Sequence, residues 1–275
     1  MELVVFDMDR TLLNARSEIT PYTAETLRRM SSAGIAYTVA TGRTLQAARG
    51  PIADHGFTLP HIIKNGAVIW CPHQQEYSHS HLLTPTEVWH VLAAFTIQEL
   101  TPFVFTLEEN GRHAVYHPAL KNETEAKLAQ LFEEERHLPL EPISEMPEDS
   151  AVINISAMGA SEKVKAVITS IDNEPSLVAY TGIAAQAGGL RWLDIHHSLG
   201  SKGNGIATLR EELPVTKVIV FGDGENDLSM FDIADESYAP ENADDEIKAI
   251  ASEVIGHHDE DGVARFLRQR FNLGD

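Results

Sequence analysis

Two carboxylates, Asp7 and Asp9, follow a short apolar run at residues 3–6. One carboxylate can act as a nucleophile, a second can move protons, and both can bind a hard cation such as Mg²⁺. The same pattern also occurs in plain turns, where Asp bonds to its own backbone. A calcium loop of the EF-hand type is excluded, because its sixth position requires Gly and here is Leu12.

A second acidic cluster, with Asp223 and Asp227, occupies residues 222–227. Its run Gly-Asp-Gly-Glu-Asn-Asp fails as a dinucleotide-binding loop, which would need Gly at the last position. It also fails as an EF-hand loop, whose sixth position falls on Leu228. A plain Asp-Gly turn and a site for a hard cation such as Mg²⁺ remain as interpretations.

Two further clusters have residues that can bind an anion. Thr41, Gly42 and Arg43 either start a helix capped by Thr41 or offer backbone N–H groups to an anion. Lys202 stands at the expected start of another helix, where a lone lysine is usually a solvated surface charge. Neither cluster decides between its two interpretations by itself.

Thirteen histidines raise the question of a zinc site. The adjacent pairs His196-His197 and His257-His258 lack the i, i+4 spacing of ligands on one helix face, and neither has a clear third ligand. We therefore expect these histidines in loops or at the surface.

Four polar clusters each follow an expected strand. The strands and the polar residues after them are 3–6 with Asp7, 35–40 with Thr41, 61–63 with Asn65, and 217–221 with Asp223. Strands that alternate with helical patterns predict an α/β fold with a doubly wound parallel sheet. Such sheets bind ligands outside the carboxyl ends of their strands, so we expect the four clusters to converge at one edge.

The middle of the chain predicts a different architecture. A capping box at Thr84-Pro85-Thr86-Glu87 starts a helix, and a hairpin follows at 103–107 and 113–116, with its turn at 109–111. An amphipathic helix is expected at 121–137, and further short strands follow it. This pattern indicates an α+β domain at residues 84–190, inserted into a core formed by 1–83 and 191–275.

Composition narrows the classes of function. The 275 residues have a formal net charge of −20, and the Lys and Arg residues form no basic stripe, so nucleic acid is not an expected partner. No stretch approaches the roughly 18 apolar residues of a membrane span, and the first residues do not read as a signal peptide. With a single cysteine, Cys71, these features favour a cytoplasmic protein; the oligomeric state is not specified.

Taken together, the clusters resemble the motifs of the haloacid dehalogenase (HAD) superfamily, specifically its Cof-type sugar-phosphatase branch with a type IIB cap. Its four motifs occur in order along the chain, as Asp7-x-Asp9-x-Thr11, Thr41-Gly42-Arg43, Lys202, and Gly222 to Asp227. The resemblance covers essentially the whole chain. One position departs from it: Arg10 stands where the motif commonly has Gly, which tolerates a left-handed backbone that would strain Arg.

The resemblance implies a Mg²⁺-dependent phosphatase that hydrolyses small phosphorylated metabolites, such as sugar phosphates, through an aspartyl-phosphate. The inserted domain would be a cap that sets substrate specificity. The resemblance implies that Asp7 is the nucleophile, that Asp9 is the general acid and base, and that Lys202 neutralises charge. It implies a cation held by Asp7, Asp9 (through its carbonyl), Asp223 and Asp227. The residues implied to bind the substrate are Thr41, Gly42, Arg43 and Asn226.

Other functions use similar residues. A phosphomutase would employ the same Asp7 and Asp9 and transfer the phosphoryl group to a second hydroxyl. A catalytically weak homologue that only binds its ligand is a further alternative, because of Arg10. A receiver domain is disfavoured, since its acid pair would directly follow the first strand and precede the phosphorylated Asp. A dehalogenase would not need the Asp223 cluster.

Overall fold

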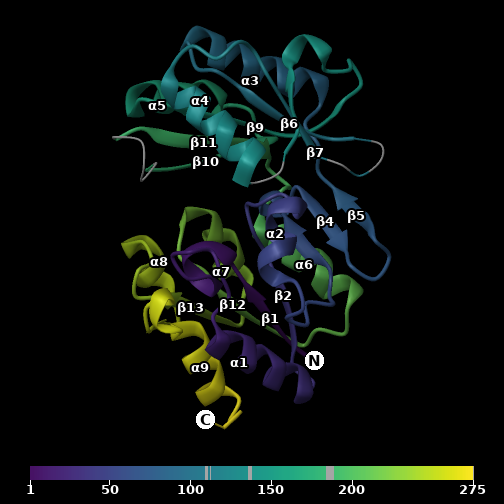
Figure 1. The fold of residues 1–275 in the computed structure, drawn as a ribbon, viewed down its shortest axis with the longest axis vertical. Coiled ribbons are helices and arrows are strands. Elements are labelled where there is room, and N and C mark those ends of the chain that lie inside the picture. Colours follow the sequence, from purple (N-terminus) through teal and green to yellow (C-terminus); the bar gives the residue numbers. More distant parts are fainter. Residues whose placement is uncertain (109–110, 112, 136–137, 184–188, 275) are drawn as a thin grey trace. The chain divides into compact units, whose positions relative to one another are not determined.

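The computed structural model describes residues 1–108, 111, 113–135, 138–183 and 189–274. The chain divides into two compact units, one formed by Met1–His79 with Ser201–Asp275 and the other by Ser80–Gly200 (Figure 1). The boundaries predicted from the sequence, 83/84 and 190/191, differ from this division. In the structure, residues 191–200 belong to the second unit, because the strand at Arg191–His197 completes its sheet.

The first unit contains a five-stranded parallel sheet in the order β14-β13-β12-β1-β2. Its strands are β1 (Glu2–Phe6), β2 (Ala36–Val39), β12 (Lys217–Phe221), β13 (Glu236–Pro240) and β14 (Glu253–Ile255). Its helices are α1 (Pro21–Ser32), α2 (Leu45–Ile52), α6 (Lys202–Glu212), α7 (Leu228–Ile233), α8 (Asp245–Ile250) and α9 (Gly262–Arg270). The predicted α/β fold with a parallel sheet is thus confirmed.

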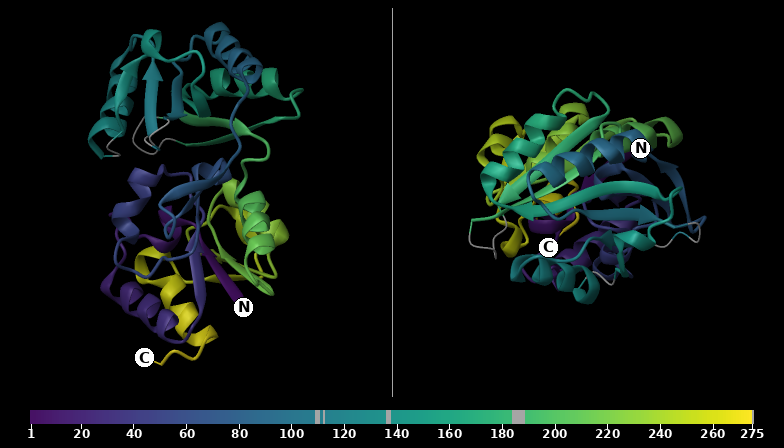
Figure 2. Two further views of the ribbon diagram at one scale, coloured as in Figure 1. Left: turned by 90° about the vertical axis from the view of Figure 1, so that its right-hand side faces the viewer. Right: turned by 90° about the horizontal axis from the view of Figure 1, so that it is seen from above.

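Both faces of this sheet are buried by helices, as a doubly wound fold requires. Helices α1 and α9 cover one face and α6 lies on the other (Figure 2). On the α6 side, Leu3 and Val5 of β1 share a core with Ile206 and Leu209 of α6. On the opposite side, Phe221 packs edge-on against Phe266 of α9. Burial on both faces explains why the central strands β1 and β12 are apolar along most of their length rather than alternating.

The third strand that the sequence predicts, β3 (His61–Ile63), is not a regular member of the parallel sheet. It pairs antiparallel with β4 (Val68–Cys71), which continues to β5 (Glu76–Ser80) in a three-stranded sheet. A single parallel bridge from Ala40 to Ile62 links it to the end of β2. This bridge suffices to bring the residues after β3 beside those after β2.

The second unit is a six-stranded mixed sheet with helices, in the order β10-β11-β9-β6-β7-β8. Its elements are α3 (Pro85–Ile97), β6 (Phe103–Leu107), β7 (His113–His117), α4 (Glu123–Gln130), β8 (Leu140–Pro142), β9 (Ala151–Gly159), α5 (Ser161–Ile171), β10 (Leu177–Ile183) and β11 (Arg191–His197). Thr84 and Glu87 form the predicted capping box of α3. The predicted hairpin turn includes residues 109–110, and the predicted helix at 121–137 includes 136–137, which lie outside the described residues.

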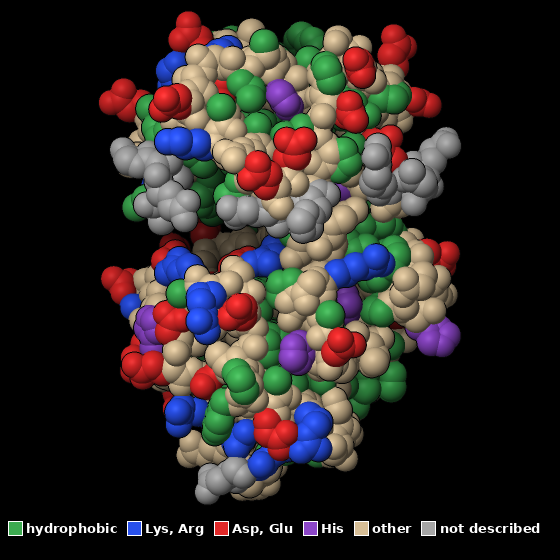
Figure 3. All heavy atoms as spheres, in the orientation of Figure 1, with side chains coloured by type: hydrophobic (Ala, Val, Ile, Leu, Met, Phe, Trp, Pro, Cys, Tyr) green, Lys and Arg blue, Asp and Glu red, His purple; other side chains and the backbone are tan. Residues whose placement is uncertain are grey.

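Two properties of the structure concern nucleic acid and membranes, which the sequence does not predict as partners. On the face drawn in Figure 3, the described Lys and Arg side chains are interspersed with Asp and Glu and form no continuous basic stripe. Among the described residues, no helix combines the length and the apolar character needed to cross a bilayer.

Candidate active site

Asp7 is the first residue after β1, and the chain turns sharply behind it. Its N–H still donates to Phe221 O across the sheet (2.8 Å), after which the backbone forms an irregular helical turn at Met8–Leu12. Within this turn Arg10 adopts φ 58°, ψ 10°. The turn leaves Asp7 buried at the sheet edge and places Asp9 two residues on with half of its side chain in solvent.

Lys202 meets Asp7 at this edge, although 195 residues separate them in the chain. It is the first residue of α6, whose N-cap Ser201 accepts a hydrogen bond from Asn204 N–H (3.1 Å). Its Nζ donates to Asp7 Oδ1 (2.5 Å) and to Asp227 Oδ1 (2.6 Å), and its side chain is fully buried. Lys202 is therefore not the solvated charge that its local sequence suggests.

Close backbone approach fixes the start of α6. Gly66 has φ +98°, and a Cβ atom there would lie 2.1 Å from Ser201 O. Only glycine fits both this conformation and this contact. The Asn65-Gly66 segment that follows β3 thus positions Lys202 by direct contact with the residue before it.

The second acidic cluster folds back on itself after β12. Asp227 Oδ2 accepts hydrogen bonds from Asp223 N–H (2.8 Å) and Gly224 N–H (3.0 Å). Thr11 Oγ1, from the first motif, donates to Asp223 Oδ1 (3.1 Å). The loop therefore presents Asp223 and Asp227, both buried, toward the Asp7 turn rather than forming an isolated Asp-Gly turn.

The charges at this edge are not balanced. Burial raises the pKa of the Asp7 carboxyl well above its usual range, Lys202 opposes this shift, and Asp227 and Asp223 add to it. Burial also raises the pKa of Asp223 to about 7, with a further contribution from Asp227. Burial disfavours the Lys202 ammonium, but Asp227 and Asp7 outweigh it, so the pKa of Lys202 is raised overall. The cluster thus holds more negative charge than Lys202 alone can offset.

This donor set fits a hard divalent cation. Asp7, Asp223 and Asp227 each offer a carboxylate oxygen, and these oxygens lie within 4.8 Å of one another. Mg²⁺ prefers oxygen ligands of this kind, and an added positive charge would offset the excess of buried carboxylate. Asp9, which the sequence also assigns to the cation through its carbonyl, is not a member of this carboxylate group.

The Thr41-Gly42-Arg43 segment adjoins the same edge but does not start a helix. Thr44, not Thr41, caps α2, and the Thr41 hydroxyl instead accepts from Arg43 N–H (3.1 Å). Thr41 O accepts from Asn65 N–H (2.8 Å), which joins the ends of β2 and β3. The interpretation of Thr41 as a helix cap is therefore wrong, because the chain needs three more residues to turn into α2.

Asp9 and Arg43 form a two-pronged ion pair. Arg43 Nε donates to Asp9 Oδ2 (2.8 Å) and Arg43 Nη2 to Asp9 Oδ1 (2.5 Å), while Arg43 Nη1 donates to Ala47 O (3.1 Å). Arg43 is mostly buried, with 15% of its side chain exposed, whereas 52% of the Asp9 side chain is exposed. Because the third hydrogen bond anchors the guanidinium to α2, Arg43 orients Asp9, and Asp9 does not orient Arg43.

Asn226 reaches the site through a residue to which the sequence assigned no chemical role. Its Nδ2 donates to Asn65 Oδ1 (2.9 Å), a contact between the loops after β12 and β3. Asn65, from the polar cluster after residues 61–63, and Thr11, from the first motif, are thus supporting residues of the site. Their position after a strand was the available signal.

Residues 4–267 match the family of haloacid dehalogenase-like hydrolases. The chain belongs to this family. The resemblance to the Cof-type branch of the HAD superfamily is confirmed, as is the prediction of a phosphatase of the HAD type.

Two relatives and one solved structure illustrate the similarity to HAD-like hydrolases. The chain is 26% identical to the 5-amino-6-(5-phospho-D-ribitylamino)uracil phosphatase of Bacillus subtilis, over 98% of each chain. It is 25% identical to the pyridoxal phosphate phosphatase of Escherichia coli, over 96% of this chain and 97% of that one. A HAD subclass IIB sugar phosphatase has the same fold, with a TM-score of 0.78 and 24% identity over the full length of both chains.

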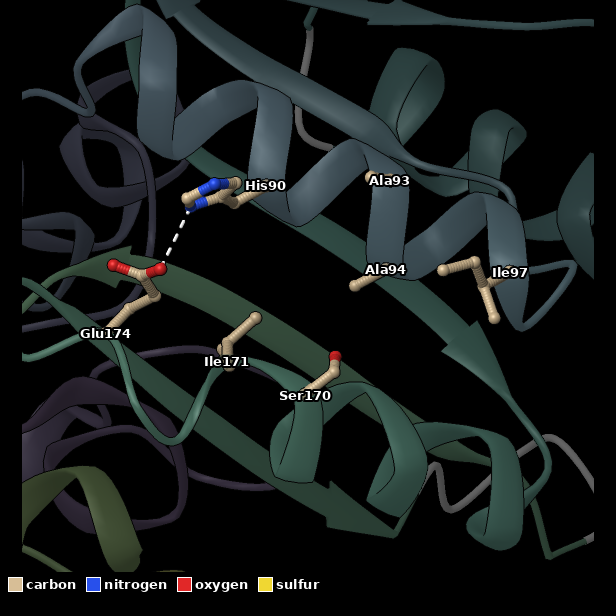
Figure 4. A pocket seen from close by; sticks show the side chains of 7 residues that line it. All are labelled: His90, Ala93, Ala94, Ile97, Ser170, Ile171 and Glu174. Atoms are coloured by element: carbon tan, nitrogen blue, oxygen red, sulfur yellow. Dashed lines mark ion pairs between the residues drawn. The ribbon is translucent and has the colours of Figure 1, made fainter.

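Two other features do not belong to this HAD site. His257 and His258 lie beside Asp259, but His257 Nδ1 accepts from Asp259 N–H (3.2 Å) and His258 Nδ1 contacts Leu13 O (2.9 Å). A pocket in the second unit lies between α3 and α5 and is lined by Ala93, Ala94, Ile97, Ser170 and Ile171 beside a His90–Glu174 ion pair (Figure 4). It contains none of the candidate catalytic residues.

Proposed function

We propose that this HAD-family chain is a Mg²⁺-dependent phosphatase that hydrolyses small phosphorylated metabolites through an aspartyl-phosphate on Asp7. The observation that carries the proposal is the buried group of Asp7, Asp223 and Asp227 around Lys202. Relatives named as phosphatases of phosphorylated metabolites support this class of substrate. A cytoplasmic location belongs to the same proposal.

The first chemical step is assigned to the free side of the Asp7 carboxylate. Among the described residues Lys202 holds Oδ1 of Asp7, and Oδ2 is assigned the in-line attack on phosphorus that forms an acyl phosphate. As that bond forms, the bond from phosphorus to the leaving oxygen breaks, and Asp9 supplies the proton that the leaving oxygen needs. The fixed charge of Lys202 stabilises the negative charge that spreads over the transferring group.

The second step regenerates the enzyme. Asp9, now a carboxylate, accepts a proton from a water molecule that attacks phosphorus and displaces Asp7. In the structure both carboxylate oxygens of Asp9 accept hydrogen bonds from Arg43. This ion pair must open before Asp9 can carry a proton. In this proposal phosphate oxygens would be held by Arg43, the Thr41 hydroxyl, the Gly42 N–H and Asn226.

Mg²⁺ would be held by the carboxylates of Asp7 and Asp223, the Asp9 carbonyl and, through water, Asp227. It would supply positive charge that lets a carboxylate approach a phosphate dianion. Asp227 is already fully engaged by Lys202 and two backbone N–H groups, which favours an indirect role. The second unit would act as the cap that selects the leaving group.

A panel of phosphorylated metabolites, assayed for inorganic phosphate with Mg²⁺ present, tests the proposal. Asp7→Asn serves as the blank, and Asp245→Asn, an exposed carboxylate on α8, serves as the matched control. We expect wild type and the control to release phosphate from some of the panel, and Asp7→Asn to release none. Wild-type rates in Asp7→Asn would refute the nucleophile, and transfer to a second sugar hydroxyl would indicate a mutase.

A further inference from the structure

Arg10 occupies a backbone conformation that suits glycine. It lies between Asp9 and Thr11 at φ 58°, ψ 10°, where a residue with a Cβ atom is strained. Strain alone assigns no role. The role of Arg10 must therefore come from the contacts of its side chain.

The Arg10 side chain is held at the acidic edge by three residues. Its Nη1 lies 3.3 Å from Asp223 Oδ2, and its Nη2 donates to Asn242 O (2.9 Å). Asn242 Nδ2 donates in return to Arg10 O (2.8 Å), and Asp244 Oδ1 lies 3.9 Å from Nη2. Arg10 therefore does not extend away from its own loop into solvent, although 55% of its side chain is exposed.

This contact completes the set of partners around Asp223. Oδ1 of Asp223 accepts from the Thr11 hydroxyl, and Oδ2 faces the Arg10 guanidinium. Asp7 and Asp227 share Lys202 in the same way. Among the described residues, each carboxylate of the group that fits a cation thus already has a positively charged neighbour.

A divalent cation bound by these carboxylates would meet Arg10 as a competitor. The cation and the guanidinium would share the oxygens of one carboxylate, Asp223, and their like charges would repel at short range. We propose that Arg10 is a positioning residue that holds Asp223 when no divalent cation is bound and lowers the affinity of the site for Mg²⁺. This inference rests on the cation site of the proposed function and adds a residue that tunes it.

The expected effect is moderate. The pair is half exposed on the arginine side, where ion pairs are weak, so removing the charge should change Mg²⁺ affinity by about two- to fivefold. Arg10→Gln keeps a residue with a Cβ atom in the left-handed conformation and removes only the charge. Arg10→Lys keeps the positive charge but lacks the forked guanidinium group.

Calorimetric titration of the chelator-treated full chain with Mg²⁺ alone measures this effect without any assay of turnover. We expect Kd to fall about two- to fivefold in Arg10→Gln and to stay near the wild-type value in Arg10→Lys. The matched control is Arg28→Gln on α1, which removes the same charge from an exposed arginine paired with Glu25. It should leave Kd unchanged. If Arg10→Gln does not fold, Arg10→Gly removes the charge and the strain together and serves in its place.

Asp223→Asn separates this inference from the proposed function. Mg²⁺ binding that depends on Asp223 but is equal or weaker in Arg10→Gln would overturn the role of Arg10 and leave the cation site standing. Absence of Mg²⁺ binding in wild type, Arg10→Gln and Arg10→Gly alike would overturn both. Binding in Arg10→Gln that wild type lacks would support both.

Discussion

The ammonium group of Lys202 lies 2.5 Å from Asp7 Oδ1 and 2.6 Å from Asp227 Oδ1, out of contact with solvent. A buried charge of this kind persists only when its partners are fixed around it. Here the partners come from the ends of β1 and β12, which are neighbours in the sheet. The pairing of β1 with β12 therefore positions the first and last motifs of the HAD site next to each other.

Replacing Lys202 by Met should damage both stability and catalysis. The change leaves Asp7 and Asp227 as uncompensated buried carboxylates, which should lower the free energy of unfolding by about 3 kcal/mol. Loss of a fixed positive charge at the reacting phosphoryl group should lower kcat by about 10²-fold or more. Urea unfolding and steady-state phosphate release measure the two effects.

The matched control for this prediction is Lys248→Met on α8, whose lysine pairs with the exposed Asp245. Exposed pairs contribute about 0–1 kcal/mol, so this variant should behave as wild type. Equal effects of the two substitutions would contradict the role given to Lys202.

The sequence predicted the parallel sheet because the strands at 3–6 and 218–221 are continuous apolar runs that alternate with helical patterns. It predicted the convergence of polar residues because parallel strands end at one edge. It did not predict the burial of Lys202, since nothing within residues 200–204 distinguishes a buried from a solvated lysine. That distinction depends on Gly66 and Asp7, which are remote in sequence. The antiparallel pairing of β3 was missed for a related reason, because a three-residue apolar run does not reveal its partner.

Arg43 should matter through the geometry of its guanidinium rather than its charge alone. It donates hydrogen bonds to both carboxylate oxygens of Asp9 and to Ala47 O. The single ammonium group of lysine cannot reproduce this arrangement. We expect Arg43→Gln to lower kcat/KM by roughly 10- to 100-fold and Arg43→Lys to recover only part of the loss. Arg49→Gln, which changes an arginine stacked on Trp70, is the control; a similar loss there would argue against a specific role.

Withdrawal of divalent cation should abolish turnover and lower stability together. The carboxylates of Asp7, Asp223 and Asp227 lie close together, and burial, followed by the charge of Asp227, raises the pKa of Asp223. A bound cation would offset this concentration of negative charge. We expect EDTA to remove activity and added Mg²⁺ to restore it. Saturation at 100 times Kd should add about 2.7 kcal/mol to the free energy of unfolding. Thermal unfolding with and without Mg²⁺ provides the measurement, and turnover that persists in EDTA would rule out the cation's role.

Gly66→Ala should disturb the site indirectly, by displacing Ser201 and with it Lys202. The new methyl group would lie 2.1 Å from Ser201 O and would force α6, with Lys202 at its start, to move. We expect a loss of about 2 kcal/mol or more and a fall in kcat, measured by urea unfolding and phosphate release. Gly34→Ala is the control, because Gly34 also has positive φ (+71°) but has open space around its Cα. Its backbone strain should lower stability to a smaller extent and leave kcat unchanged, so equal losses of kcat would contradict the clash.

His61, at the start of β3, should make the protein sensitive to mild acid. Burial lowers the pKa of its imidazole to about 4, against an ordinary value of 6.5, while its Nε2 contacts Phe57 O (3.3 Å). Below pH 6.5 the unfolded chain takes up a proton that the folded chain refuses, so stability falls as the pH drops and the loss levels off near pH 4. At pH 5 the loss should be about 2 kcal/mol, since each pKa unit corresponds to about 1.4 kcal/mol. Urea unfolding at pH 7.5 and pH 5 should therefore show a smaller acid loss in His61→Gln than in wild type, whereas the exposed His73→Gln should match wild type. An equal acid loss in wild type and His61→Gln would show that other groups govern this pH range.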